Sequence, residues 1–172
     1  MGYINHVDRF ILLPEAGSAI ARLNRAGRPV VVVSNQSGVA RGYFPESLLQ
    51  IVNQKMIDLL AADNAFLEAI YYCPHHPRAE NPAYRRECNC RKPKPGLFLK
   101  AAEELGLDLS RSVAVGDRHS DLKAARTVGA KAVLVMTGYG RGELEYVIPR
   151  KDIQPDLVAE NLNQAVDWIL AQ

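Results

Sequence analysis

Short β-branched runs alternate along this chain with amphipathic stretches, and this alternation restricts the fold more than any other feature. Strands are predicted at residues 29–35, 69–74, 112–117 and 131–138. Apolar residues at helical spacing predict helices over residues 14–27, 45–61, 95–106, 119–129 and 161–172. The first run, Pro-Val-Val-Val-Val-Ser-Asn, is typical of a strand covered on both faces. We therefore expect an α/β fold of three layers, with a mainly parallel sheet between helices.

Length and composition narrow the class of protein. The 172 residues, 48% hydrophobic and 23% charged, predict a single soluble domain over residues 1–172. A net charge of +2 gives no reason to expect nucleic acid or a membrane as a partner. The N-terminus lacks a basic start followed by a long apolar core, and three cysteines cannot all pair in one chain. We expect a reduced, cytoplasmic protein, and a monomer because no exposed apolar repeat is visible.

All three cysteines lie in one segment, residues 71–96, which we interpret as a metal-binding loop. Cys73 is followed by His75 and His76, and Cys88 and Cys90 form a second close pair. Thiolate and imidazole suit Zn²⁺, and four such ligands complete a closed, structural site. The alternative is three free thiols beside a surface histidine, but three thiols in a polar loop are not core residues. The spacing does not decide whether His75 or His76 is the fourth ligand.

Polar residues follow the predicted strands, where parallel sheets bind their ligands. The first strand is followed by hydroxyl and amide side chains that can hold phosphate oxygens, although such residues also cap helices. Asp117 ends a later strand, with Asp121 four residues on; a carboxylate there serves Mg²⁺ or caps a helix. Arg91 and Lys92 follow the last cysteine directly, and their alternative is a solvated basic loop. The first group is Ser34, Asn35, Gln36 and Ser37.

In this order, the residues resemble a known family. Ser34, then Lys92, then Gly116-Asp117-x-x-x-Asp121 are similar to the second, third and fourth motifs of haloacid-dehalogenase (HAD)-type phosphatases. The segments Ser-Asn-Gln-Ser-Gly-Val-Ala-Arg-Gly and Cys-Asn-Cys-Arg-Lys-Pro-Lys-Pro-Gly look like the D,D-heptose 1,7-bisphosphate phosphatases. The related histidinol-phosphate phosphatases carry a similar zinc loop. The resemblance runs over nearly the whole chain.

The resemblance implies a role for each matching residue. Ser34 and Lys92 would stabilise the charge of the transferring phosphoryl group, and Asp117 would hold the catalytic Mg²⁺. Structural Zn²⁺ would be held by Cys73, His75, Cys88 and Cys90, which selects His75. The substrate, a phosphosugar, would be contacted by Gly2, Tyr3, Ser34, Asn35, Gln36, Ser37, Arg91, Lys92 and Arg118. The zinc loop would fix Arg91 and Lys92 over the site.

One family motif, Asp-x-Asp-Gly-Thr, does not occur in the 172 residues. In the family it follows a central strand just before the Gly-Tyr that matches Gly2-Tyr3, and it supplies the nucleophile and the general acid/base. We therefore expect that the central N-terminal strand is missing, that the native reading frame extends upstream, and that this chain alone is inactive. The expected activity of the extended chain is hydrolysis of the 7-phosphate of D-glycero-D-manno-heptose 1,7-bisphosphate, a step in building a lipopolysaccharide precursor. The alternatives are a histidinol-phosphate phosphatase and a non-catalytic, zinc-bearing module that binds a phosphosugar or a protein.

Overall fold

The computed structural model describes residues 3–172, so Gly2 lies outside the described part. The chain forms two compact units, one ending at Cys88 and the other running from Asn89 to Gln172. Whether the two units form one domain over residues 1–172 depends on how they pack together, so the single domain stays a prediction. Each unit is built from parallel strands and helices, which confirms the α/β class.

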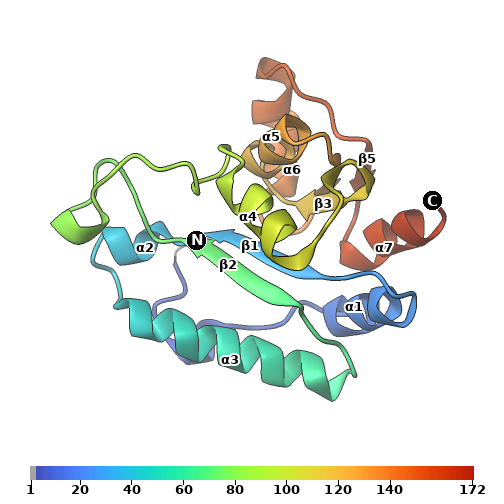
Figure 1. Ribbon diagram of the computed structural model, residues 1–172, viewed down its shortest axis with the longest axis horizontal. Coiled ribbons are helices and arrows are strands. Elements are labelled where there is room, and N and C mark those ends of the chain that lie inside the picture. The colour runs from blue at the N-terminus through green and yellow to red at the C-terminus, as the bar shows by residue number, and fades with distance from the viewer. Residues whose placement is uncertain (1–2) are drawn as a thin grey trace. The chain divides into compact units, whose positions relative to one another are not determined.

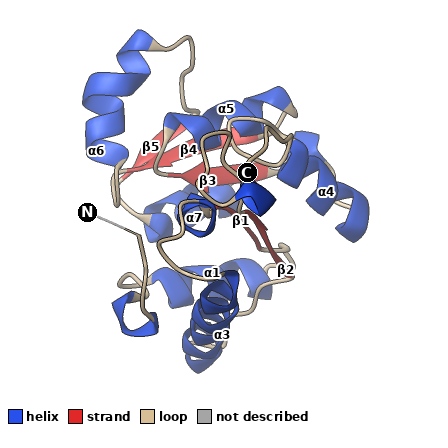
Figure 2. Cartoon of the chain, turned by 90° about the vertical axis from the view of Figure 1, so that its left-hand side faces the viewer, coloured by secondary structure: helices blue, strands red, loops and turns tan. Residues whose placement is uncertain are grey.

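The first unit holds a parallel pair of strands, β1 (Val31–Asn35) and β2 (Ala69–Cys73). Its helices are α1 (Ala16–Arg25), α2 (Ser37–Ala40) and α3 (Glu46–Ala62). α1 contacts α3, and Figures 1 and 2 show α3 running along one side of the two strands. All five β1 residues are half-buried rather than fully covered, since among residues 3–172 the strand has a hydrogen-bonded neighbour on one side only.

The second unit is a three-layer arrangement by itself. Its parallel sheet has the order β3 (Val113–Gly116), β4 (Lys131–Val135), β5 (Leu157–Ala159). α5 (His119–Thr127) and α7 (Leu162–Leu170) cover opposite faces of this sheet (Figure 2). α4 (Gly96–Leu105) and a helical stretch that begins with α6 (Gly140–Gly142) complete the unit.

The core of the second unit follows the two-residue period of its central strand. Ala132 and Leu134 of β4 point to the face covered by α5, where they pack with Leu122. Val133 and Val135 point to the other face, in the same cluster as Ala165 of α7. After the exposed Lys131, this strand is therefore apolar at every position to Val135, as expected for a strand between two helical layers.

Local signals placed most helix ends correctly. Gly106 ends α4 with φ +65°, the left-handed conformation that glycine adopts without a steric penalty. At α1 the C-cap is Ala26, and Gly27, the last residue of the predicted helix, lies one residue beyond it with φ +66°. Pro45 is the residue before α3 rather than part of its first turn. β5 was not predicted, because its three residues are too few to show a period.

Candidate active site and metal centre

The cysteines and one histidine gather into a cluster at the end of β2. Cys73 is fully buried, and its Sγ lies 3.5 Å from Sγ of Cys88 and 3.8 Å from Nδ1 of His75. Cys90 follows Cys88 by two residues along the chain. One ligand atom from each residue lies within 4.8 Å of the others in the set Cys73, His75, Cys88 and Cys90.

These separations fit a tetrahedral zinc site. Zn–S bonds of about 2.3 Å and Zn–N bonds of about 2.0 Å place neighbouring ligand atoms roughly 3.5–3.8 Å apart. The two distances from Cys73 Sγ, 3.5 and 3.8 Å, are close to that range. Three thiols and one imidazole also form a donor set that suits zinc better than it suits hard cations. The cluster could therefore hold a structural zinc ion.

The two adjacent histidines have different surroundings. His75 turns Nδ1 toward Cys73, while its Nε2 lies 2.5 Å from a guanidinium nitrogen of Arg86. Burial, reinforced by the charge of Arg86, lowers the pKa of His75 and favours the neutral imidazole that binds metal. In His76, Nδ1 accepts from the backbone N–H of Arg78 at 3.1 Å, and Nε2 lies 3.2 Å from a guanidinium nitrogen of Arg41. Both ring nitrogens of His76 thus have partners outside the cluster.

Hydrogen bonds to one carboxylate brace the loop between the cysteine pairs. Glu46, in the first turn of α3, accepts from the hydroxyls of Tyr72 at 3.0 Å and Tyr84 at 2.6 Å. Burial and the hydrogen bond to Glu46 raise the pKa of Tyr72, and the hydrogen bond to Glu46 is the main cause that raises the pKa of Tyr84. The side chain of Arg85 donates to the backbone carbonyls of Ala79 and Glu80. Polar contacts therefore hold a loop that has little apolar material.

The residues predicted at the end of β1 lie together in the first unit. The side-chain amide of Gln36 donates to Oγ of Ser34 at 3.0 Å, and the backbone N–H of Gln36 donates to the carbonyl of Cys73 at 2.8 Å. Ser37 is buried, and its Oγ lies 3.4 Å from the hydroxyl of Tyr3. This strand end therefore presents hydroxyl and amide groups of the kind that can hold phosphate oxygens.

Asp117 lies in the second unit, one residue after β3 ends. Its Oδ2 accepts from the backbone N–H of Tyr139 at 2.9 Å. Gly138 has φ +61°, and a Cβ at that position would lie 2.3 Å from Asp117 Oδ2. Glycine is thus required for the turn after β4 to approach the carboxylate. A carboxylate at a strand end, held from one side by a backbone donor, is suited to binding Mg²⁺.

Lys92 and Asp121 form an ion pair in the same unit as Asp117. Nζ of Lys92 lies 2.8 Å from Oδ1 of Asp121, and each side chain is 12% exposed. The other oxygen of Asp121 accepts from the backbone N–H of Arg118 at 3.1 Å and so caps α5. A Cβ on Gly116 would lie 2.4 Å from that of Asp121. Asp121 therefore serves as a helix cap and also positions the lysine.

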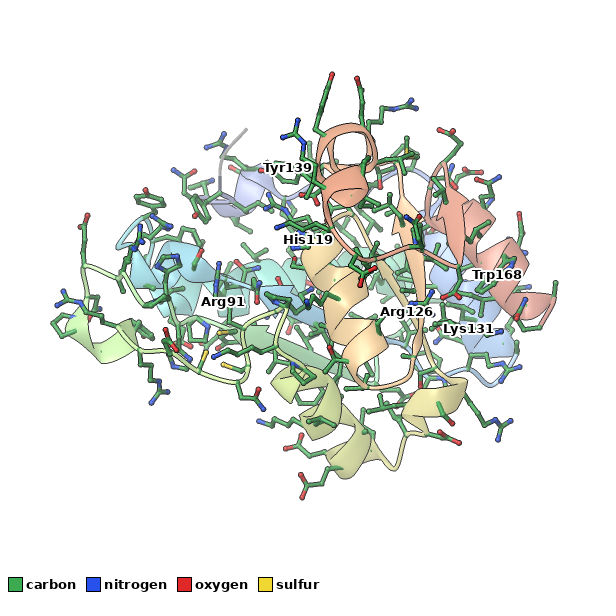
Figure 3. All side chains as sticks on the ribbon, turned by 90° about the horizontal axis from the view of Figure 1, so that it is seen from above. Arg91, His119, Arg126, Lys131, Tyr139 and Trp168 are labelled. Carbon is green, nitrogen blue, oxygen red and sulfur yellow. The ribbon has the colours of Figure 1, made fainter. Side chains whose placement is uncertain are left out.

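Residues that follow β4 contact the residues that follow β3. These later residues were not predicted from the sequence as part of the site. The guanidinium carbon of Arg118 lies 3.7 Å from the ring centre of Tyr139. Glu143 accepts from the backbone N–H of His119 at 2.9 Å. The Gly-Tyr-Gly sequence directly after a predicted strand was the available signal, because such glycines mark a close backbone approach. Figure 3 labels Arg91, His119 and Tyr139.

Comparison with known proteins identifies the family. A family model described as HAD-hydrolase-like matches residues 89–165. The chain is 40% identical over 171 residues to D-glycero-beta-D-manno-heptose-1,7-bisphosphate 7-phosphatase of Escherichia coli strain K12, covering 98% of this chain and 80% of the relative. The chain belongs to this family of HAD-like phosphatases.

Other members support the assignment. D-glycero-D-manno-heptose-1,7-bisphosphate 7-phosphatase of Thermosynechococcus vestitus is 40% identical over 173 residues, covering 98% of this chain and 88% of that protein. The D,D-heptose 1,7-bisphosphate phosphatase of B. bronchiseptica, solved with magnesium and phosphate, has a TM-score of 0.87 at 36% identity, covering 98% of this chain and 89% of that one. A putative HAD-like phosphatase from Mesorhizobium loti has a TM-score of 0.81 at 32% identity, covering 99% of this chain and 78% of that one. The predicted HAD-like α/β fold is thereby confirmed. No helix within residues 3–172 is long and apolar enough to span a membrane.

Proposed function

We propose that this HAD-like phosphatase removes the 7-phosphate from D-glycero-D-manno-heptose 1,7-bisphosphate. The observation that carries the proposal is identity of about 40% over 98% of the chain to relatives named for this reaction. Phosphate and magnesium in the B. bronchiseptica structure are consistent with the chemistry. A monomeric, cytoplasmic enzyme acting on this small phosphosugar, without nucleic acid or membrane partners, completes the proposal.

Asp117 and Lys92 would act on the phosphoryl group together with Ser34. Asp117 would hold Mg²⁺, which when bound neutralises negative charge on phosphoryl oxygens. The ammonium of Lys92, held by Asp121 at 2.8 Å, would stabilise charge that grows on those oxygens. The Ser34 hydroxyl would donate to a phosphoryl oxygen. Arg91, Arg118, Tyr3 and the amides after β1 would bind the rest of the substrate.

The covalent step needs a carboxylate that the 172 residues do not supply as an Asp-x-Asp-Gly-Thr motif. In the proposed reaction, an aspartate oxygen attacks phosphorus, the bond from phosphorus to the sugar oxygen breaks, and that oxygen takes a proton from a general acid. Water then hydrolyses the aspartyl-phosphate. We therefore propose that the 172-residue chain binds substrate without turning it over.

Zinc would act indirectly. The ligands Cys88 and Cys90 lie one to four residues before Arg91 and Lys92, so fixing the thiols limits the positions open to the two cations. A closed tetrahedral site leaves no position for a reacting water, which favours a structural role.

The test measures phosphate release, with Mg²⁺, from heptose 1,7-bisphosphate and from histidinol phosphate. It compares the 172-residue chain with a version extended by the residues encoded in frame upstream of Met1. Turnover of the heptose ester by the extended version alone is the expected result. Faster release from histidinol phosphate would make that ester the substrate. No phosphate release by either version of the protein would favour a non-catalytic binding module.

A further inference from the structure

The segment after β4, residues 138–143, contacts residues 117–119, where α5 begins, at three points, and one tyrosine provides two of them. The backbone N–H of Tyr139 donates to Asp117, and the ring of Tyr139 lies 3.7 Å from the guanidinium carbon of Arg118. The third contact runs from the backbone N–H of His119 to Glu143. Figure 3 shows Tyr139 beside the His119 end of α5, with Arg126 at the other end.

Two glycines determine where the tyrosine sits. A Cβ on Gly138 would lie 2.3 Å from Asp117 Oδ2, and one on Gly140 would lie 1.8 Å from the carbonyl oxygen of Val135. A side chain at position 140 would require a shift of the backbone, and one at position 138 would displace the Asp117 carboxylate. The ring of Tyr139 is therefore presented at a defined place next to Asp117, although it is 40% exposed.

A ring under a guanidinium changes what the arginine can do. Arginine has many rotamers, and ordering it costs conformational entropy when a ligand must do so on binding. Attraction between the cation and the ring face holds the group before the ligand arrives, while the N–H edges stay available to an anion. The contact therefore pre-organises Arg118 for an anionic partner.

We propose that Tyr139 is a positioning residue that sets Arg118 to receive an anionic oxygen of the substrate. This inference rests on the proposed function, which makes that substrate a sugar bisphosphate. The ring acts through Arg118 alone, because Asp117 is held by the backbone N–H, which any residue except proline supplies. Removing the ring should weaken substrate binding and leave Mg²⁺ affinity unchanged.

The test is calorimetric titration of the 172-residue chain with heptose 1,7-bisphosphate in the presence of Mg²⁺. Tyr139→Leu should raise the dissociation constant roughly two- to fivefold, the range of an exposed cation–π contact. Tyr139→Phe keeps the ring and should restore the wild-type value. The matched control is Tyr146→Leu, which removes an exposed tyrosine of the same unit and should change nothing.

A double-mutant cycle separates positioning from a general structural effect. Arg118→Ala should raise the dissociation constant about tenfold, the effect of losing a charged hydrogen bond. Adding Tyr139→Leu to Arg118→Ala should cause no further loss. A full additional loss in the double variant, or equal affinity of wild type and Tyr139→Leu, would overturn the proposal.

A second readout does not depend on the substrate. The Arg118 Hε resonance should be shifted upfield by the ring current in wild type and in Tyr139→Phe, and this shift should vanish in Tyr139→Leu. A wild-type resonance without the shift would also overturn the positioning role. If the shift is present but wild type does not bind the bisphosphate, the proposed substrate is wrong and the orientation of Arg118 by the ring still stands.

Discussion

At the residue scale, the ion pair between Lys92 and Asp121 links the proposed chemistry to α5, the helix that begins two residues after Asp117. Both side chains are largely shielded from water, so each charge depends on the other for compensation. Asp121 also caps α5 through the backbone N–H of Arg118. One oxygen of the Asp121 carboxylate pairs with Lys92 and the other caps α5. Substituting Lys92 should therefore have a different effect from substituting Asp121.

Lys92→Ala should abolish phosphate binding at the site while the domain stays folded. It removes the cation but leaves the cap of α5 in place, and the now unpaired carboxylate should cost about 1–3 kcal/mol of unfolding free energy. Asp121→Ala loses the cap as well, and its cost should be larger by about 1 kcal/mol. Chemical denaturation and phosphate titration check both. Undiminished phosphate affinity in Lys92→Ala would remove this lysine from the site.

Gly138→Ala should displace Asp117. The substitution places a Cβ in the left-handed region and also 2.3 Å from the carboxylate oxygen. The control is Gly129→Ala, where φ is +78° but nothing lies within 4 Å, so only backbone strain of about 1–2 kcal/mol applies. We expect weaker Mg²⁺ binding in Gly138→Ala only, measured by titration calorimetry. Equal Mg²⁺ affinity in both variants would contradict the close approach.

At the scale of elements, the sequence predicted strands and helices well and the turns between them poorly. β4 was predictable because an apolar run of this length between turn residues is a local signal. The Gly138–Gly140 turn was not, because its importance depends on Asp117, which is distant in sequence. The loop between the cysteine pairs was predictable in part. Its residue types indicated metal binding, but they did not indicate the hydrogen bonds of Tyr72 and Tyr84 to Glu46.

Cys90→Ser should lower the zinc content of the purified protein and loosen this loop. Removing one thiolate leaves three ligands, and hydroxyl oxygen is a poor substitute for sulfur on zinc. Metal analysis and limited trypsin digestion check the result, because Arg85 and Arg86 lie inside the loop. Chelating zinc from the wild type should produce the same cleavage. An unchanged zinc content would exclude Cys90 as a ligand.

At the scale of the molecule, each unit has its own apolar cluster. The second unit covers both faces of its sheet, and Leu134 is fully buried in one of the two clusters. Trp168, the single tryptophan of the chain, contacts the other cluster. Its fluorescence therefore reports on the unfolding of this unit.

Leu134→Ala should lower the free energy of unfolding, as followed by Trp168 fluorescence, by about 2–5 kcal/mol, since it leaves a cavity between β4 and α5. Leu99→Ala is the matched control, because Leu99 is a 48% exposed leucine of the same unit. Its effect should stay below about 1 kcal/mol. Urea unfolding followed by fluorescence measures both, and equal shifts would place Leu134 outside the core.

The sequence by itself determined the class of fold, the zinc-type ligand set and the order of phosphate-handling residues. These follow from periodicity and residue type, which are local properties of the chain. Tertiary structure alone decided that His75 rather than His76 turns a ring nitrogen toward a thiol, that Asp121 pairs with Lys92, and that Tyr139 contacts Asp117 and Arg118. Each of these depends on atoms brought within hydrogen-bonding or contact distance by the packing of separate strands, a relation that spacing along the chain does not encode.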